Sequence, residues 1–503
     1  MIKVFLKHGR DESLRRFHPW VFSGAVAQVQ GSPAEGDIVG VYSAEGQLLA
    51  CGHWQVGSIA VRILSFDGDP TAPDFWVNAI SRALQVRIAV GLYSVCDISE
   101  PVGELPLKTS GCAGPLPSDD GPLPLTMPRV ARFSEAVADL AYSEMPRTTC
   151  FRVIHGGGDG LPGLIIDWYD GVCVMQAHSV GMFRAKMQIC EALRTVFGDR
   201  LKAVYDKSSG TAPFKAGLDL VDGYLWRAEG FTASETVVYE NGRQFLVNWE
   251  EGQKTGFFLD QRDNRALVGK YAAGRSVLNL FCYTGGFSIY ALTSGAVRVD
   301  SVDSSAKAMS LVERNIALNS TPGSGPSFLR SRGLLRVGEG PAESAMQVAV
   351  DAASGPDRES DYPAIPLEGV QGVKEDDSQK LCNNFCEDAI EFLRKIPEGK
   401  YDLMIVDPPA FAKHRGALKN ALRAYQRLNA AAIAQVAPGG LVVTFSCSQV
   451  VDKITFANTV FSAAAQTGRS VRILDRLCQG VDHPVSIYHP EGEYLKGLLL
   501  YVE

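Results

Sequence analysis

The chain of 503 residues lacks long uncharged apolar runs near its start. Its first twenty residues carry seven charged side chains, which leaves no room for the apolar core of a signal peptide. Residues 428–451 are uncharged, but Pro438, Gly439 and Gly440 interrupt them. This segment therefore predicts a helix, a turn and a strand, not a membrane span. We expect a cytoplasmic protein without a membrane partner.

Cysteine pairs are also missing, although the chain contains 11 cysteines. The cysteines are scattered, none stands in a CxxC motif, and their number is odd, which favours reduced thiols over a disulfide framework. Cys382 and Cys386 are the nearest pair. Because no second pair or nearby histidine completes a zinc site, the sequence predicts no metal site.

The net charge of −7 comes from one segment of the chain. Residues 339–377 hold ten acidic and two basic residues, a local charge of −8, which leaves the remainder at about +1. The charge therefore excludes neither an acidic nor a basic partner for the rest of the protein.

The length is too great for one core, so we expect several domains. Short apolar runs separated by turns predict a small β barrel over residues 1–70. Residues 71–146 predict a helix followed by a Pro-rich linker or insertion, and residues 147–235 a small α+β domain. Residues 236–503 alternate apolar strands with helices, which indicates a doubly wound parallel α/β sheet. Residues 320–380, rich in Gly, Pro, Ser and acids, predict a surface insertion in it.

The first predicted strand of this sheet, 276–281, leads into Cys-Tyr-Thr-Gly-Gly at 282–286. Glycines there allow a cofactor to approach the backbone, and Asp303 at the end of the next strand suits the two hydroxyls of a ribose. The spacing is not GxGxxG, so a nucleoside cofactor without phosphate, such as S-adenosylmethionine, is favoured over a dinucleotide. A plain strand–turn–helix with a solvated Asp303 is the alternative.

Two later strand ends carry further candidates for the same edge of the sheet. Asp407–Phe411 (Asp-Pro-Pro-Ala-Phe) combines a rigid loop with free carbonyl groups and a phenyl ring that can stack on a base. Cys447 ends the strand at 440–445, where a thiolate can attack C6 of a pyrimidine. The alternatives are a loop that only ends a strand and a small buried apolar cysteine.

Basic residues gather near the second of these loops. Lys413, Arg415 and Lys419 follow the prolines, and no acidic residue stands between them. Such a run is typical of a solvated helix face, but it also suits a phosphate backbone beside the site.

The motifs together resemble the bacterial large-subunit (23S) ribosomal RNA cytosine-5 methyltransferase I family, which is of the class I, S-adenosylmethionine-dependent type with an N-terminal PUA domain. The resemblance runs nearly end to end, outside the two low-complexity inserts. The motifs that carry it are Arg15–Gly24, Gly158–Gly163, Gln253–Asp263, Leu278–Phe287, Asp407–Phe411, Thr444–Ser448, Asp482–Val485 and Glu493–Gly497. Cys282, Gln449 and Gly157 differ from the Ser, Gly and Glu that are common in the family.

The resemblance implies a Rossmann-like class I methyltransferase sheet, preceded by a PUA-like β barrel and a small α+β domain, and a role for individual residues. Cys447 is the implied nucleophile, and Asp407 contacts the cytosine ring or the cofactor. S-adenosylmethionine is the implied cofactor and ribosomal RNA the implied partner. The implied cofactor residues are Gln261, Arg262, Asn279, Phe281, Tyr283, Gly285, Gly286, Asp303 and Asp388; the implied RNA-binding residues are Arg15, Arg16, Lys413, Arg415 and Lys419.

The expected reaction is methylation of cytosine C5 in ribosomal RNA through a bond between Cys447 and C6. Two alternatives remain open. One is methylation of a guanine or adenine amino group, since Asp-Pro-Pro-Phe loops also serve that chemistry and it needs no thiol. The other is an RNA-binding assembly factor without catalytic activity.

Overall fold

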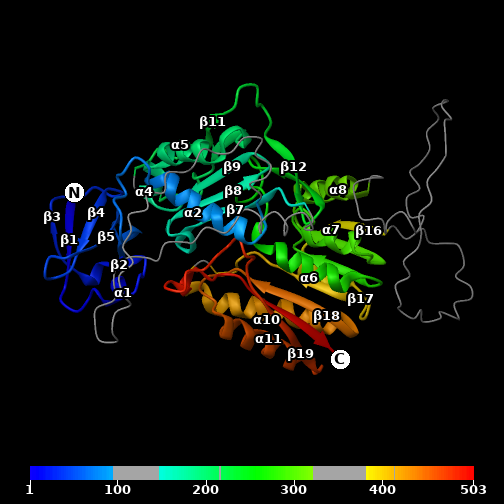
Figure 1. Cartoon of the computed structure of the whole chain (residues 1–503). Coiled ribbons are helices and arrows are strands. Elements are labelled where there is room, and N and C mark those ends of the chain that lie inside the picture. Colours follow the sequence, from blue (N-terminus) through cyan, green and yellow to red (C-terminus); the bar gives the residue numbers. More distant parts are fainter. Residues whose placement is uncertain (94–146, 214–216, 321–380, 413) are drawn as a thin grey trace, which may run out of the picture.

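The computed structural model describes residues 1–93, 147–213, 217–320, 381–412 and 414–503. The expected insertions at 99–128 and, apart from Ser320, at 320–380 lie outside the described residues, as does Lys413. Figure 1 shows the N-terminal part on the left, a middle part above, and the largest sheet on the lower right.

The N-terminal domain is a six-stranded sheet around its own apolar core. Its strand order is β2-β6-β5-β4-β1-β3, and a single turn of helix, α1 (Glu12–Arg15), precedes β2. Val4, Val39, Val41 and Val61 are fully buried in this core, which explains the apolar runs in the sequence. The strands are β1 (Ile2–Leu6), β2 (Trp20–Phe22), β3 (Val26–Gln30), β4 (Ile38–Tyr42), β5 (Leu48–Trp54) and β6 (Ile59–Ser65).

The middle domain is a five-stranded sheet in the order β11-β10-β9-β8-β7, covered by helices. Helix α2 (Phe75–Ala89) packs against α5 and β7, so the helix of the 71–146 segment belongs to this core. Two short helices, α4 (Val180–Arg184) and α5 (Lys186–Phe197), follow each other in the chain, and Ser179 is the N-cap of α4. The strands are β7 (Cys150–His155), β8 (Leu164–Tyr169), β9 (Val172–Ala177), β10 (Ala203–Asp206) and β11 (Gly223–Arg227).

A hairpin, β12 (Glu235–Glu240) and β13 (Arg243–Asn248), joins the middle domain to the C-terminal domain. Its buried residues Phe245 and Trp249 share an apolar cluster with Tyr169 of the middle domain and Tyr290 of the C-terminal domain. The hairpin therefore fixes the two domains against each other.

The C-terminal domain is the predicted doubly wound sheet, and that prediction is confirmed. Its seven strands have the order β16-β15-β14-β17-β18-β20-β19. In this sheet, β16, β15, β14, β17 and β18 pair in parallel. Strand β20 lies between β18 and β19 and pairs with both in the antiparallel direction. The strands are β14 (Ser276–Leu280), β15 (Arg298–Asp303), β16 (Cys382–Cys386), β17 (Tyr401–Val406), β18 (Val436–Ser446), β19 (Val471–Leu477) and β20 (Lys496–Val502).

Helices cover both faces of this sheet because its strands are apolar on both sides. Leu278 and Met404 face a cluster formed with α9, α10 and α11, whereas their neighbours Val277 and Leu403 face a cluster formed with α6 and α7. The helices are α6 (Arg262–Ala272), α7 (Gly286–Thr293), α8 (Ala306–Ser320), α9 (Ala389–Lys395), α10 (Leu418–Gln435) and α11 (Lys453–Thr467). Within the described ranges, no helix is both long and apolar enough to cross a membrane.

The segment between β19 and β20 leaves the sheet and reaches the other two domains, as the red segment of Figure 1 shows. Asp482 in this segment accepts hydrogen bonds from the Arg262 side chain (2.6 Å) and from the backbone N–H of Arg152 (2.8 Å). Arg87 of α2 donates to the Asp482 carbonyl (2.7 Å) and pairs with Asp159. Hydrogen bonds from Arg87 and from the Arg152 N–H to Asp482 thus hold the middle domain on this segment.

Candidate active site

The order of the strands reverses between β14 and β17, the strands in the middle of the C-terminal sheet. In open α/β sheets, ligands bind at such a switch point, beyond the carboxyl ends of the strands. The loop after β14, the loop after β17 and Cys447 after β18 all lie at this edge. The structure thus brings together three of the features that the sequence singled out.

The loop after β14 has an unusual backbone conformation. Phe281 (φ 57°), Tyr283 (φ 48°) and Gly285 (φ 79°) all have positive φ, which costs energy for the two aromatic residues. A Cβ atom at Gly286 would lie 3.0 Å from Cδ of Arg265. Tyr283 also fixes the preceding segment, because its hydroxyl accepts from the Gln253 N–H at 2.9 Å. The loop is therefore held in a tight shape at the carboxyl edge of the sheet.

Asp303 closes one side of this loop. Its Oδ2 accepts from the Tyr283 N–H at 3.0 Å, and its Oδ1 accepts from the Ser305 N–H at 2.9 Å. Each carboxylate oxygen retains a second lone pair. A half-buried carboxylate so oriented fits the vicinal hydroxyls of a nucleoside.

Asp407, directly after β17, is half-buried and carries a perturbed pKa. Burial raises the pKa of its carboxyl group to about 7, and the negative charge of Asp260 adds to this rise. The Gln261 side chain donates to Asp407 Oδ2 at 3.0 Å and opposes the shift, while Asn264 donates to the Gln261 carbonyl oxygen at 2.6 Å. Asp407 is thus positioned by neighbours and can exchange a proton near neutral pH.

Cys447 stands at the end of β18 with its side chain partly covered by the apolar cluster beneath the sheet. Burial raises the pKa of the thiol to about 11, and the carboxylate of Asp407 raises it further, which places the two side chains in one electrostatic environment. Lys254 and Lys496 act in the opposite direction and lower this pKa. The thiol therefore needs a proton acceptor before it can act as a nucleophile.

Lys496 is a site residue that the sequence analysis missed. It is buried at the start of β20, and its Nζ donates to the carbonyl groups of Ser448 (2.7 Å) and Tyr494 (2.6 Å). Burial lowers the pKa of Lys496 to about 8, and the neighbouring Cys447 opposes that shift. The sequence did contain a signal for this residue: Lys496 is the only charged residue in the strand Lys-Gly-Leu-Leu-Leu-Tyr-Val.

Three expected cofactor residues have other partners. The Arg262 guanidinium is buried between Asp482 and Glu240. The Asn279 side chain is buried in the sheet and donates to Ser288 Oγ at 2.9 Å. Asp388 is exposed after β16 and caps α9, because its Oδ1 accepts from the Ile390 and Glu391 N–H groups.

The expected RNA-binding residues fall into two groups. Arg15 and Arg16 in the N-terminal domain form ion pairs with Asp11 and Glu12 one turn away. Arg415 and Lys419 are exposed at the start of α10, close to the carboxyl edge of the sheet. The second group lies on the same side of the sheet as Cys447.

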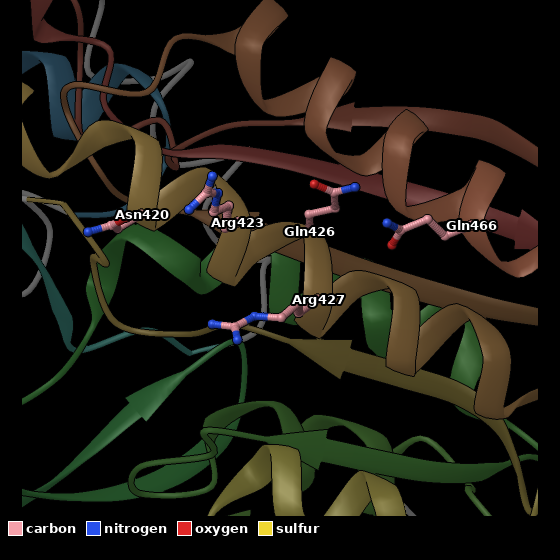
Figure 2. A pocket seen from close by; sticks show the side chains of 5 residues that line it. All are labelled: Asn420, Arg423, Gln426, Arg427 and Gln466. Carbon is pink, nitrogen blue, oxygen red and sulfur yellow. The ribbon is translucent and has the colours of Figure 1, made fainter.

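A hollow of about 350 Å³ lies farther along α10. Figure 2 shows the polar side chains that line it, which come from α10 and α11: Asn420, Arg423, Gln426, Arg427 and Gln466. None of these residues belongs to the strand ends described above. The hollow is therefore a basic surface feature next to the site, not the cofactor pocket.

Known proteins resemble the chain in parts and over its whole length. Residues 4–66 match a PUA-like domain, and residues 217–338 match an S-adenosylmethionine-dependent methyltransferase domain. The solved structure of a putative S-adenosylmethionine-dependent methyltransferase from Streptococcus mutans has a TM-score of 0.66, with 17% identity and full coverage of both chains. A second one, SMU.776 complexed with SAH, has the same TM-score at 18% identity and full coverage.

These similarities confirm the expected fold, a PUA-like domain followed by a class I methyltransferase sheet, and the expected cofactor, S-adenosylmethionine. Ribosomal RNA large subunit methyltransferase I of Aeromonas hydrophila is 31% identical over 99% of this chain and 98% of its own length. The protein of the same name from Pseudoalteromonas atlantica is 32% identical with the same coverage. The chain therefore belongs to the ribosomal RNA large subunit methyltransferase I family, whose methyltransferase domain depends on S-adenosylmethionine.

Proposed function

We propose that this protein methylates C5 of a cytosine in the RNA of the large ribosomal subunit, through a transient bond between Cys447 Sγ and C6. The names of the relatives support the RNA substrate. One observation carries the choice of base: a thiol and a carboxyl group with a pKa of about 7 end neighbouring strands at the switch point. A thiol is needed for C5 chemistry and has no task in amino-group methylation.

The two side chains divide the chemistry between them. Asp407 accepts the proton of the Cys447 thiol as Sγ adds to C6, and the resulting carboxylic acid donates it to N3 of the cytosine. C5 gains the electron density that the C5–C6 double bond loses and becomes nucleophilic. After methylation, the C5 proton passes to water, the C5–C6 double bond re-forms as Sγ leaves C6 as a thiolate, and N3 returns its proton to the Asp407 carboxylate. Lys254 and Lys496 stabilise the thiolate on its formation and release.

We assign the cofactor to the loop 281–286 and to Asp303. These residues offer backbone groups and a carboxylate, which suit a nucleoside without phosphate. S-adenosylmethionine supplies an electrophilic methyl group when bound. Gln261 contributes by holding the Asp407 carboxylate at the edge of the sheet.

Nucleoside mass spectrometry of ribosomal RNA, treated with the protein or left untreated, tests the proposal. We expect 5-methylcytidine to appear with the wild type and with Cys478→Ala, whose thiol is exposed. Cys447→Ala should form none and still bind S-adenosylmethionine. RNA containing 5-fluorocytidine should form a covalent complex with the wild type only, because the C5 fluorine cannot leave as a proton.

Methylation of a guanine or adenine amino group is the second candidate. The Asp407–Phe411 loop favours it, because its free carbonyl groups can accept from an exocyclic amine and Phe411 can stack on the base. The same mass spectra separate the two reactions, since an N-methylated purine and full activity of Cys447→Ala would exclude the covalent route.

A further inference from the structure

The segment between β19 and β20 meets the N-terminal domain around three side chains with metal-binding groups. His18 comes from the turn before β2, and His489 and Glu491 come from a turn that precedes β20. One ligand atom of each residue lies within 4.8 Å of the others. Nε2 of His18 is 3.9 Å, and Nε2 of His489 is 3.8 Å, from Oε2 of Glu491.

His489 is the residue that needs an explanation. It is only 5% exposed, yet neither of its ring nitrogens has a hydrogen-bond partner within the part of the chain that the structure describes. Its ring packs edge-on against Trp20, with the centroids 4.3 Å apart, and burial lowers its pKa. A buried imidazole without a partner loses the free energy of its hydrogen bonds to water, unless another group takes its lone pair.

The surroundings leave room for this imidazole and for a ligand. A Cβ atom at Gly157 would lie 3.2 Å from His489 Nδ1, so the glycine at this position provides the space that the ring occupies. Glu491 is 55% exposed, which opens one side of the cluster to solvent. An ion can therefore enter without rearrangement of the core.

Backbone contacts fix the orientation of the His18 ring. Its Nδ1 accepts a hydrogen bond from the Trp20 backbone N–H at 3.2 Å and lies 3.3 Å from the Trp20 carbonyl oxygen. When Nε2 binds a metal ion, the ring proton moves to Nδ1, where this carbonyl oxygen can accept it, as in the usual second-shell arrangement of a histidine ligand. That Nε2 is the atom that faces Glu491.

We propose that His18, His489 and Glu491 form a binding site for a divalent transition metal, Zn²⁺ in particular, that joins the PUA-like domain to the methyltransferase domain. Two imidazoles and one carboxylate are a ligand set that zinc accepts, with water in the fourth position. Bonds of about 2.0–2.1 Å place tetrahedral ligands roughly 3.4 Å apart. The two histidine–glutamate separations, 3.9 and 3.8 Å, therefore close by about half an ångström on binding, and the separation between the two imidazoles, which is within 4.8 Å, closes by at most about 1.4 Å.

Such an ion has a clear structural consequence. The PUA-like domain meets the β19–β20 segment here through two contacts between rings: a tilted contact of Phe17 with Tyr488 and an edge-on contact of His18 with His489. A metal between His18 and Glu491 adds a link of fixed geometry to this contact. Binding therefore stabilises the folded chain and fixes the PUA-like domain relative to Cys447.

The test uses the full-length protein, stripped of metal with a chelator and titrated with Zn²⁺ by calorimetry and with Co²⁺ by absorption. We expect one ion per chain, tetrahedral Co²⁺ bands without a thiolate-to-metal charge-transfer band, and a rise of Tm. Glu491→Gln, at a half-exposed position that keeps the fold, should weaken binding at least about tenfold. His489→Gln should do the same.

The matched control is His8→Gln. His8 also lies near a glutamate, with Nε2 3.8 Å from Oε1 of Glu45, but both are exposed, and among the residues that the structure describes they belong to no cluster of three potential metal ligands. Its metal affinity should equal that of the wild type. The proposal is overturned if the stripped protein binds no zinc, if Glu491→Gln binds it unchanged, or if the cobalt spectrum reports thiolate ligands.

Discussion

Two buried regions of this protein hold carboxylates in opposite ways. Asp482, between the middle and C-terminal domains, accepts from Arg262, from the Arg152 N–H and from His483. Although burial alone would raise its pKa, Arg262 and His483 hold it well below the usual range. Asp407, at the edge of the sheet, accepts a hydrogen bond from Gln261, and burial together with the charge of Asp260 raises its pKa to about 7.

The comparison separates a carboxylate that stabilises the fold from one that can act as an acid or a base. A buried carboxylate that is paired with arginines keeps its charge and fixes the position of its partners. A buried carboxylate without a cationic partner gains and loses its proton near neutral pH, which is what acid–base chemistry needs. Burial is thus shared by both regions, and the neighbouring charges decide what each carboxylate does.

The largest expected effect is that of Asp407→Asn on turnover. The variant cannot move the proton between the thiol and N3, so we expect the rate of methyl transfer to fall about 10²- to 10⁴-fold. Transfer of labelled methyl groups to ribosomal RNA measures this, and Tm should not fall. Turnover within tenfold of the wild type would show that the raised pKa has no role in the reaction.

Asp482→Asn should act on stability instead. Removing the charge of Asp482 leaves Arg262 with the longer ion pair to Glu240, and we expect the free energy of unfolding to fall by about 3–5 kcal/mol. Urea denaturation gives this value, with Asp475→Asn on the exposed strand β19 as the control. If both variants unfold at the same urea concentration, the pair contributes nothing to stability.

The pH dependence of stability should differ between the two carboxylates. The folded pKa of Asp407, about 7, lies above the value of about 3.9 in an unfolded chain, so the folded state binds more protons between these values. Asp407 therefore lowers stability as the pH rises from about 4 to 7, whereas Asp482 stabilises above about pH 4 and loses this effect as the pH falls. Asp407→Asn should gain stability over the wild type from pH 5 to pH 8. If the urea midpoints of the variant and the wild type differ by the same amount at pH 5 and at pH 8, the pKa of Asp407 is not raised in the folded state.

The smallest effect is expected for exposed charges. Arg415→Gln and Lys419→Gln should each reduce the slope of log affinity for RNA against log salt by about 0.7–0.9, without a change of Tm. Arg394→Gln, which removes a surface pair with Glu391, is the control and should leave the slope unchanged. An unaltered slope in all three variants would place the RNA elsewhere.

Much of the fold could be predicted because local patterns carried it. The strands expected at 276–281 and 440–445 occur as β14 and β18, and the expected alternation of apolar strands with helices over residues 236–503 is present. The sequence analysis did not predict β19 and β20, because their position in the sheet depends on pairing with β18, not on a local signal. The same holds for the partners of Arg262, which lie 220 residues away at Asp482.

The sequence by itself determined the class of the sheet, the loop for a nucleoside and the candidates Asp407 and Cys447, because residues that follow apolar strands gather at one edge. Only the tertiary structure decided which buried charges are paired, that Lys254 and Lys496 lie near the thiol, and that His18 meets His489. The physical reason is that pKa values and ligand sets depend on distances of a few ångströms between side chains that are far apart in the chain.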